Sequence, residues 1–206
     1  MTQNLRLGDG TKTYTLTPAN SDVLANWTLP IAQTSGDTSW GDTANTSNTP
    51  HLYATGNTSY GNYYNWYAAT AGTGLGTMSS ASATDLTNAA ESICPKGWRL
   101  PDGGAVENSK SFYTLNKALG GTGANMTDPT LRNKYLASPY LFPYSGYYHV
   151  RSDGVHDQNS LGRWWSRSAD ATAGLAYSFY IDVNDRVYSL FGDYVGHGLT
   201  VRCLSR

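Results

Sequence analysis

Aromatic side chains, rather than branched aliphatic ones, supply most of the large apolar groups of this 206-residue chain. It contains 16 Tyr and 6 Trp, but isoleucine only at Ile31, Ile93 and Ile181. This bias predicts an irregular, loop-rich structure with an aromatic core. Over residues 1–60, apolar anchors alternate with Thr, Ser, Asn and Gly stretches, which favours short strands in long loops. At 39% hydrophobic content, we predict a single domain over residues 1–206.

Charge and hydropathy argue against two broad classes of function. Only 14% of the residues are charged and the formal net charge is −1, which provides no positive field to hold DNA or RNA. No apolar run reaches the roughly 18 residues that span a bilayer, and no charged-then-apolar secretory leader opens the chain. We therefore expect neither a nucleic-acid partner nor a membrane span.

Helices are predicted only before the last third of the chain. Residues 84–92 form a weak helix candidate. A stronger one covers residues 105–119, where apolar side chains recur at helical spacing and Gly120 ends the pattern. Asp128-Pro129 predicts the N-cap and first turn of a second helix that runs to about Leu136.

Beyond Pro143 the pattern changes to β structure. Residues 176–182 alternate as a half-buried strand does, with odd-numbered side chains on the core face and Ser178, Tyr180 and Asp182 on the other. Residues 183–187 predict a turn into a further strand, and residues 199–203 alternate again and would close the sheet. The residues assigned to the core are Trp165, Tyr177, Phe179, Ile181, Val187 and Val201.

The segment from Tyr135 to Arg206 contains no Lys, Glu or Met, yet it is crowded with Tyr, Asp, Ser, Arg and His. Solvated surfaces ordinarily use long flexible Lys and Glu, whereas Tyr, Ser, Gly, Asn, Asp and Arg are typical of paratopes. The segment therefore predicts a recognition surface. The whole chain is poor in Lys, Glu and Met, which leaves chance as an alternative for part of the gap.

We expect the ligand contacts to lie off the buried faces and between the scaffold positions of this segment. Aromatic residues and Arg in such a set are hot-spot types, although any single Tyr can instead pack in the core. The predicted ligand-binding residues are Tyr147, Tyr148, His149, Arg151, His156, Arg163, Asp170, Ser178, Tyr180, Asp182, Arg186, Tyr188, Phe191, Asp193, Tyr194 and His197.

No motif in the chain predicts catalysis, a metal site or a cofactor. His51, His149, His156 and His197 show no H-E-x-x-H or comparable metal-ligand spacing. Ser166 lies in Trp-Ser-Arg-Ser, which is not the G-x-S-x-G of a nucleophile elbow. A triad that assembles only in space stays open, but we expect a protein that is not an enzyme.

The two cysteines, Cys94 and Cys203, are far apart in the sequence, so their spacing predicts neither a C-x-x-C redox pair nor a zinc knuckle. Taken alone, the pattern allows one long-range disulfide or two buried thiols.

Several ordered motifs together resemble one bacterial family, the Fibrobacter succinogenes major paralogous domain. They are Met1–Leu7 (MTQNLRL), Tyr64–Tyr67 (YNWY), Ile93–Pro101 (ICPKGWRLP), Gly162–Ser166 (GRWWS), Ala176-Tyr177 and Gly198–Cys203 (GLTVRC). The resemblance extends over nearly the whole chain. It implies an α+β, C-type-lectin-like fold related to formylglycine-generating enzymes, with a small twisted antiparallel β core, two helices and long loops.

The same resemblance implies a disulfide between Cys94 and Cys203, as in an exported protein, and an extracellular or cell-surface location. Family members usually carry residues before the MTQNL element, often with a secretion signal, so we expect such residues before Met1. The formylglycine-type oxidation needs a reactive cysteine arrangement, which these two positions do not suggest. The EPN or QPD and WND triplets of calcium-dependent lectins are absent.

C-terminal sequences of this kind resemble the variable proteins of diversity-generating retroelements. Those systems substitute adenines, typically in AAC or AAT codons, which never yields Lys, Glu, Gln, Met or Trp. The residues missing from the segment are among those forbidden, and Gln158, Trp164 and Trp165 would be fixed scaffold. The implied function is binding of a protein or glycan on another cell, phage or host surface, through a variable region of about residues 143–203. The alternative is a non-diversified adhesion or structural domain of the cell envelope.

Overall fold

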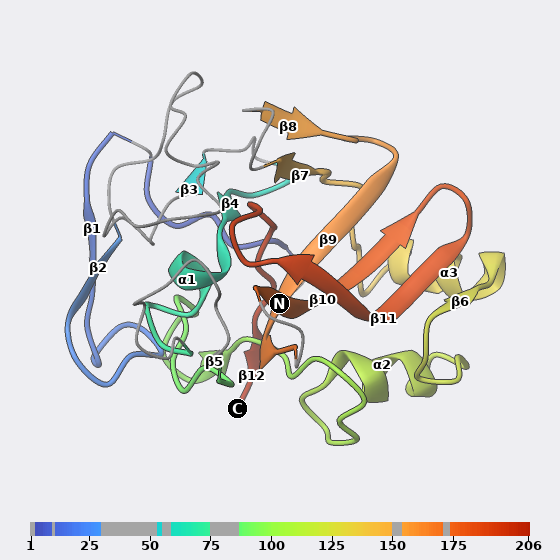
Figure 1. Ribbon diagram of the computed structural model, residues 1–206, viewed down its shortest axis with the longest axis horizontal. Helices are drawn as coiled ribbons and strands as arrows, with labels where there is room; N and C mark the ends of the chain where they lie inside the picture. Colours follow the sequence, from blue (N-terminus) through green and yellow to red (C-terminus); the bar gives the residue numbers. More distant parts are fainter. Residues whose placement is uncertain are drawn as a thin grey trace.

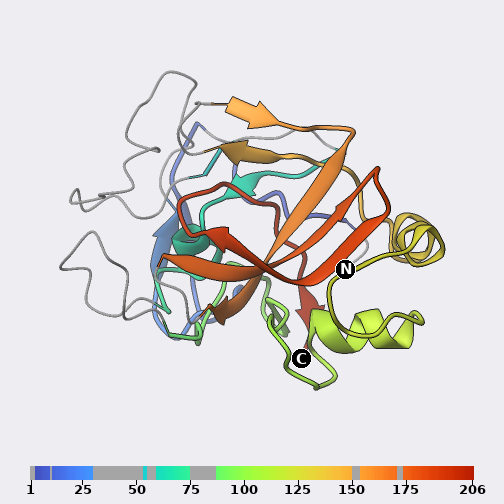
Figure 2. The same ribbon diagram turned by 45° about the vertical axis from the view of Figure 1, so that its right-hand side comes forward.

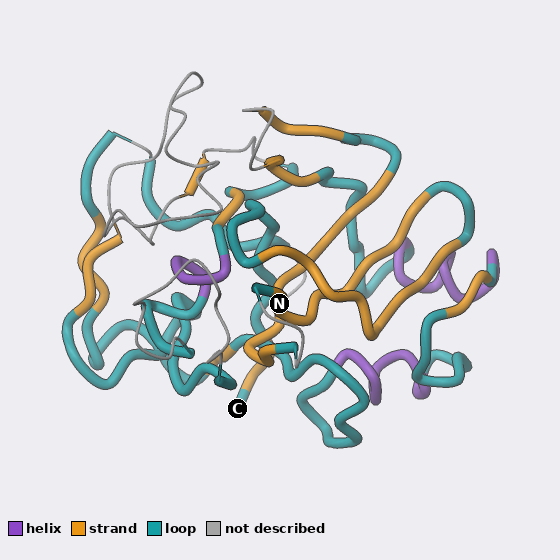
Figure 3. The backbone as a smooth tube through the Cα atoms, in the orientation of Figure 1, coloured by secondary structure: helices purple, strands orange, loops and turns teal. Residues whose placement is uncertain are grey.

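The computed structural model describes residues 3–9, 11–29, 53–54, 59–74, 87–149, 154–170 and 174–206. Its strands are β1 (Tyr14–Leu16), β2 (Trp27–Leu29), β3 (Tyr53–Ala54), β4 (Tyr63–Tyr64), β5 (Trp98–Arg99), β6 (Met126–Thr127), β7 (Tyr147–His149), β8 (Gly154–His156), β9 (Leu161–Ala169), β10 (Leu175–Asp182), β11 (Arg186–Tyr194) and β12 (Leu204–Ser205). Its helices are α1 (Trp66–Ala69), α2 (Phe112–Ala118) and α3 (Pro129–Leu136). The described part is a strand-rich mixture of α and β structure, with long connecting loops (Figure 3).

The three longest strands and the short β6 form the main sheet, in the antiparallel order β6-β11-β10-β9, which runs through the centre and right of Figure 1. The strand predicted at residues 176–182 and the turn after it are confirmed as β10 and the β10–β11 hairpin. The prediction of a solvated second face is wrong, because Ser178, Tyr180 and Asp182 are buried. Side chains from the neighbouring strands β9 and β11 cover them.

Two apolar clusters enclose the sheet. The neighbours Trp164 and Trp165 point to opposite faces of β9, and both are fully buried. Trp165 enters a cluster with α1 and the disulfide, whereas Trp164 packs with Phe179 and residues of α2 and α3, which lie beside the sheet in Figures 1 and 2. The predicted core residues Trp165, Phe179, Ile181, Val187 and Val201 are buried, but Tyr177 is only half-buried.

The helix predictions met different outcomes. The second helix is confirmed as α3, with the Asp128 carboxylate accepting hydrogen bonds from the backbone N–H groups of Thr130 and Leu131 at 2.7 and 3.1 Å. The helix predicted at 105–119 is shorter, since α2 begins at Phe112 after the Ser111 cap. Of the weak candidate at 84–92, residues 87–92 are not helical and the rest lie outside the described residues. The one-turn α1 was not predicted.

The C-terminal segment does not close the main sheet as a regular strand. Within residues 199–203, Leu199 forms a single bridge to Tyr64 and Thr200 another to Trp164. These bridges lie between β4 and β9, so the segment joins the N-terminal half of the chain to the main sheet without a continuous ladder. The alternation in its sequence is explained by packing, because Leu199, Val201 and Cys203 all enter the cluster that contains Trp165.

Covalent and polar ties fix this segment on the rest of the fold. Cys94 and Cys203 form a disulfide with an S–S distance of 2.02 Å. Arg202 is buried and donates hydrogen bonds to backbone carbonyls of the Tyr140–Leu141 turn, while its Nε donates to Asn4 Oδ1 at 3.2 Å. Burial lowers the pKa of Arg202 to about 10. Asn4 Oδ1 also accepts from Trp164 Nε1 at 2.8 Å, so one amide satisfies two buried donors.

Among the helices of the described residues, none has the length and apolar character needed to cross a membrane.

Candidate recognition surface

A β-bulge in the β10–β11 hairpin decides which side chains share a face. Ser178 pairs with Phe191, but Tyr180 pairs with Tyr188, so β11 holds one extra residue between the two pairs. A bulge of this kind re-aims the side chains beyond it. Phe191, rather than Leu190, therefore lies on the same face as Tyr180 and Tyr188. The ring centroid of Tyr180 is 5.1 Å from that of Phe191 and 5.4 Å from that of Tyr188.

Arg163 on β9 lies at the centre of this face. It is the register partner of Tyr180, and its guanidinium carbon lies 4.0 Å from the ring centroid of Tyr147 on β7. The corresponding distances to Tyr180 and Phe191 are 5.5 and 5.3 Å. These separations are typical of cation–π contacts. They join the β7–β8 hairpin to the main sheet.

Asp193 holds that arginine from β11. Its carboxylate is 3% exposed and accepts hydrogen bonds from Arg163 Nη1 at 2.8 Å and from Ser178 Oγ at 3.0 Å. His197 Nδ1 lies 3.3 Å from the same carboxylate. The buried charge is therefore paired and surrounded by polar hydrogens, as burial of a carboxylate requires.

Asp182 plays the matching role at the other end of the face. It accepts from the Tyr180 hydroxyl at 2.7 Å, from Arg186 Nε at 2.6 Å, and from the backbone N–H groups of Asn184 and Arg186. Burial alone would raise the pKa of Asp182, but the hydrogen bonds from Arg186 and Tyr180 outweigh it and lower the pKa. Burial and the bond to Asp182 raise the pKa of Tyr180, whose hydroxyl therefore stays a donor.

Three histidines complete the surface beside Tyr147. The ring centroid of His149 lies 5.5 Å from that of His156 and 5.1 Å from that of His197, and Tyr147 lies 5.4 Å from His197. Within the described ranges, no group of three His, Cys, Asp or Glu side chains is arranged to hold a metal ion.

These contacts define one face, which we name the recognition surface. It is formed by Tyr147, His149, His156, Arg163, Ser178, Tyr180, Asp182, Arg186, Tyr188, Phe191, Asp193, Tyr194 and His197. All were predicted as ligand contacts, and the ring, ion-pair and hydrogen-bond contacts above connect them, with Tyr194 joined through His197 at 5.5 Å. The chain thus brings together side chains that are spread over the five strands β7 to β11 and the turn after β11.

Burial divides this set into two layers. Ser178, Tyr180, Asp182, Asp193 and His197 are buried, so they support the surface from beneath rather than stand open to a ligand. The half-buried members are Tyr147, His149, His156, Arg163, Arg186, Tyr188 and Phe191, and Tyr194 is 59% exposed.

Three other predicted contacts do not join this face. Tyr148 is buried, and its backbone N–H donates to Gly198 O at 2.7 Å. Asp170 follows β9 and is half-buried near Gly192. Arg151 lies outside the described residues.

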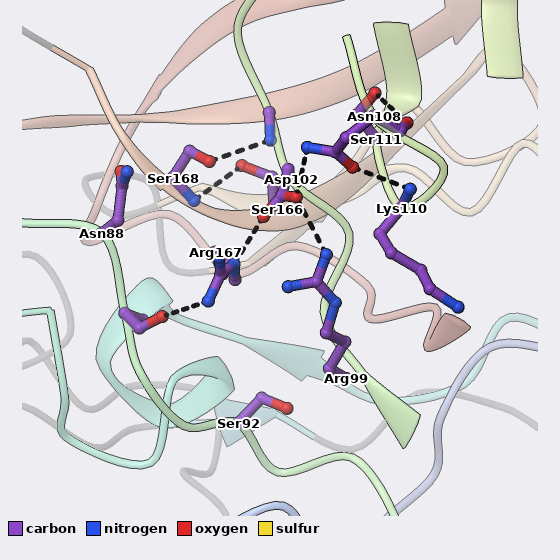
Figure 4. A network of polar contacts seen from close by, with 12 residues as sticks. Asn88, Ser92, Arg99, Asp102, Asn108, Lys110, Ser111, Ser166, Arg167 and Ser168 are labelled. Carbon is purple, nitrogen blue, oxygen red and sulfur yellow. Dashed lines mark hydrogen bonds and ion pairs between the residues drawn. The ribbon is translucent and has the colours of Figure 1, made fainter. Parts of the chain in front are cut away.

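A second polar cluster surrounds Asp102, just after the ICPKGWRLP motif (Figure 4). Its carboxylate accepts from Arg99 Nη2 at 2.9 Å and Asn108 Nδ2 at 2.8 Å, and it pairs with Arg167 Nε from β9. Nearby, Ser168 Oγ accepts from the Gly103 N–H at 3.0 Å. These contacts join the loop that contains the motif to β9, and Arg167 Nη1 also donates to Ala89 O at 3.2 Å. The cluster therefore holds β9 against two segments of the scaffold.

Sequence reasoning missed this cluster and the supporting role of Asp182 and Asp193. The only local signal was the Asp182-Val183-Asn184-Asp185 turn, where an aspartate precedes free backbone N–H groups. Neither a family model, nor a curated protein, nor a solved structure was found to match this chain.

Proposed function

We propose that this chain is a ligand-binding protein whose recognition surface contacts a protein or glycan on another cell, phage or host surface. One observation carries the proposal: thirteen of the sixteen predicted contact residues lie on one connected face. Tyr, Arg and His on a rigid sheet offer contact area at low entropic cost. The outer layer other than Arg163 would contact the ligand, and Arg163 and the buried layer would fix its geometry.

The setting of this surface supports a scaffold with a replaceable face. The disulfide, the Asp102 cluster and the Arg202 contacts hold the segments on either side of it. We propose that the scaffold is a C-type-lectin-like fold and that a diversity-generating retroelement varies residues within about 143–203. The disulfide supports an extracellular or cell-surface location, because such bonds persist in oxidising surroundings.

Binding is tested with the labelled protein on intact bacterial cells, phage particles and a glycan array. We expect Tyr188→Ala and Tyr194→Ala to lose any signal that the unchanged chain gives, with little change in stability. Tyr14→Ala is the matched control, because Tyr14 is also exposed but lies on β1, which is at the left edge of Figure 1 and contributes no residue to the recognition surface. Equal loss in all three variants, or none in the first two, would refute the assignment of this face.

Diversification is tested separately in the source DNA. We expect a near-identical template copy of the 3′ end beside a reverse-transcriptase gene, with its differences confined to adenine positions. A surface that binds ligand without such a template would instead be a fixed envelope adhesin.

A further inference from the structure

The charged centre of the recognition surface faces inward. Arg163 has only 13% of its side chain exposed, and its partner Asp193 has 3%. The pair contacts Tyr147 on β7, Ser178 and Tyr180 on β10, and His197 beyond β11. The bonds that Asp193 accepts from Arg163 and Ser178 lie within the protein, and Arg163 Nε is buried without a hydrogen-bond partner among the described residues. Little of the pair is therefore left for a ligand to reach.

A pair buried in this way behaves differently from an exposed one. Removing one member leaves the other as an uncompensated buried charge, which is strongly destabilising. Replacing both members by neutral side chains of similar volume is often neutral or stabilising. The free energy therefore depends on the combination of residues at the two positions more than on either alone.

The second ion pair of the surface provides a contrast. Arg186 pairs with Asp182, but the Arg186 side chain is 41% exposed, so a neutral residue there leaves an aspartate that still accepts from Tyr180 and two backbone N–H groups. The cost of changing Arg186 alone is correspondingly small.

We infer that Arg163 and Asp193 are positioning residues, not ligand contacts, and that a diversified surface on this scaffold can vary them only together. The part of this inference that concerns diversification rests on the proposed function. The coupling between the two positions is a property of the protein without ligand. Arg163 acts through Tyr147: by holding that ring, it sets the β7–β8 hairpin against the main sheet. Position 186, in contrast, varies independently.

The test is a double-mutant cycle of Arg163→Met and Asp193→Asn, measured by denaturant unfolding without ligand. We expect each single variant to lower the folding equilibrium constant on the order of 100-fold, and the double variant to recover to within roughly tenfold of the unchanged chain. Arg186→Met, the matched control, should change it less than about fivefold. Additive losses in the double variant would overturn the inference.

Hydrogen exchange separates positioning from general loss of stability. The Tyr148 N–H, bonded to Gly198 O, reports the hairpin, and the Phe142 N–H, bonded to Tyr135 O, reports the cluster beside α3. In Arg163→Met we expect exchange at Tyr148 to accelerate at least about tenfold more than at Phe142. Equal acceleration at both amides would show a merely structural role.

A library covers the case in which the single variants do not fold. Codons 163 and 193 are randomised together on displayed protein, and protease-resistant survivors are sequenced. Asp at 193 should be retained only with Arg or Lys at 163, whereas independent sampling of the two positions would overturn the inference. Neither outcome depends on a ligand, so failure here is distinguishable from failure of the proposed function.

Discussion

Replacing Asp102 by Ala is the most direct test of how the scaffold holds the recognition surface. Its side chain is 8% exposed and accepts from three donors, of which Arg99 is 17% exposed and Arg167 32% exposed. Breaking a buried pair costs about 3–5 kcal/mol. Because Arg167 can turn toward water, we place the loss near the lower limit, at about 3 kcal/mol.

For a chain of this length that loss corresponds to a fall in Tm of roughly 6–12 °C. Calorimetry and urea unfolding of Asp102→Ala measure it. The control is Glu107→Ala, which removes a surface pair with Lys117, 62% and 42% exposed, and should change stability far less, because solvent screens exposed pairs. If Asp102→Ala costs no more than Glu107→Ala, the cluster does not fasten the motif to β9.

The pH dependence of the same variant gives an independent check. Burial alone would raise the pKa of Asp102, but hydrogen bonds from Arg167 and Asn108 and both arginine charges outweigh it and lower the pKa. A carboxyl with a lowered folded-state pKa stabilises fully above its unfolded pKa and loses that contribution as pH falls through the folded one. The stability gap between the unchanged chain and Asp102→Ala should therefore be constant near neutral pH and narrow as the pH falls below the ordinary carboxyl pKa of 3.8.

Three further predictions follow from other contacts. Changing Cys94 and Cys203 together to Ser should cost up to about 4–5 kcal/mol on the chain-entropy model, since 109 residues separate them; urea unfolding would contradict this if its midpoint did not move. Arg202→Met should lose about 2 kcal/mol or more, because the carbonyls it satisfies become unpaired; the same titration measures it. Tyr180→Ala should lower Tm by several degrees, since the ring is buried, whereas Tyr194→Ala should not.

Local sequence signals predicted the elements that depend on local physics. The Asp128-Pro129 pair specified α3, because capping and a preset φ act within one turn. The helix predicted at 105–119 began too early, since periodicity extends past the Ser111 cap that sets the real start. Alternation located β10 but not the burial of Tyr180, because what covers that side chain comes from β9 and β11.

In the candidate site too, the residue types could be predicted from the sequence but their arrangement in space could not. Residue chemistry pointed to Tyr188, Phe191 and Tyr194, but their arrangement depends on a bulge in β11 that no alternation pattern reveals. Asp182 and Asp193 were predicted as contacts because they lie off the predicted core face and between the scaffold positions. Asp193 is instead buried beside Arg163 of another strand, and Asp182 beneath the Tyr180 and Arg186 side chains. The amino-acid composition of a segment does not indicate which side chains pair across neighbouring strands.

The Asn4 side chain has a practical consequence for anyone who expresses or displays this protein. Its amide accepts from Trp164 and Arg202 and donates to Tyr60 O at 2.8 Å, while the next residue, Leu5, donates its N–H to Val201 O. Trimming the first five residues, or fusing a bulky tag directly at that point, would strip buried partners from β9 and the C-terminal segment together. A library displayed from such a shortened chain would lose variants for reasons unrelated to the positions being varied.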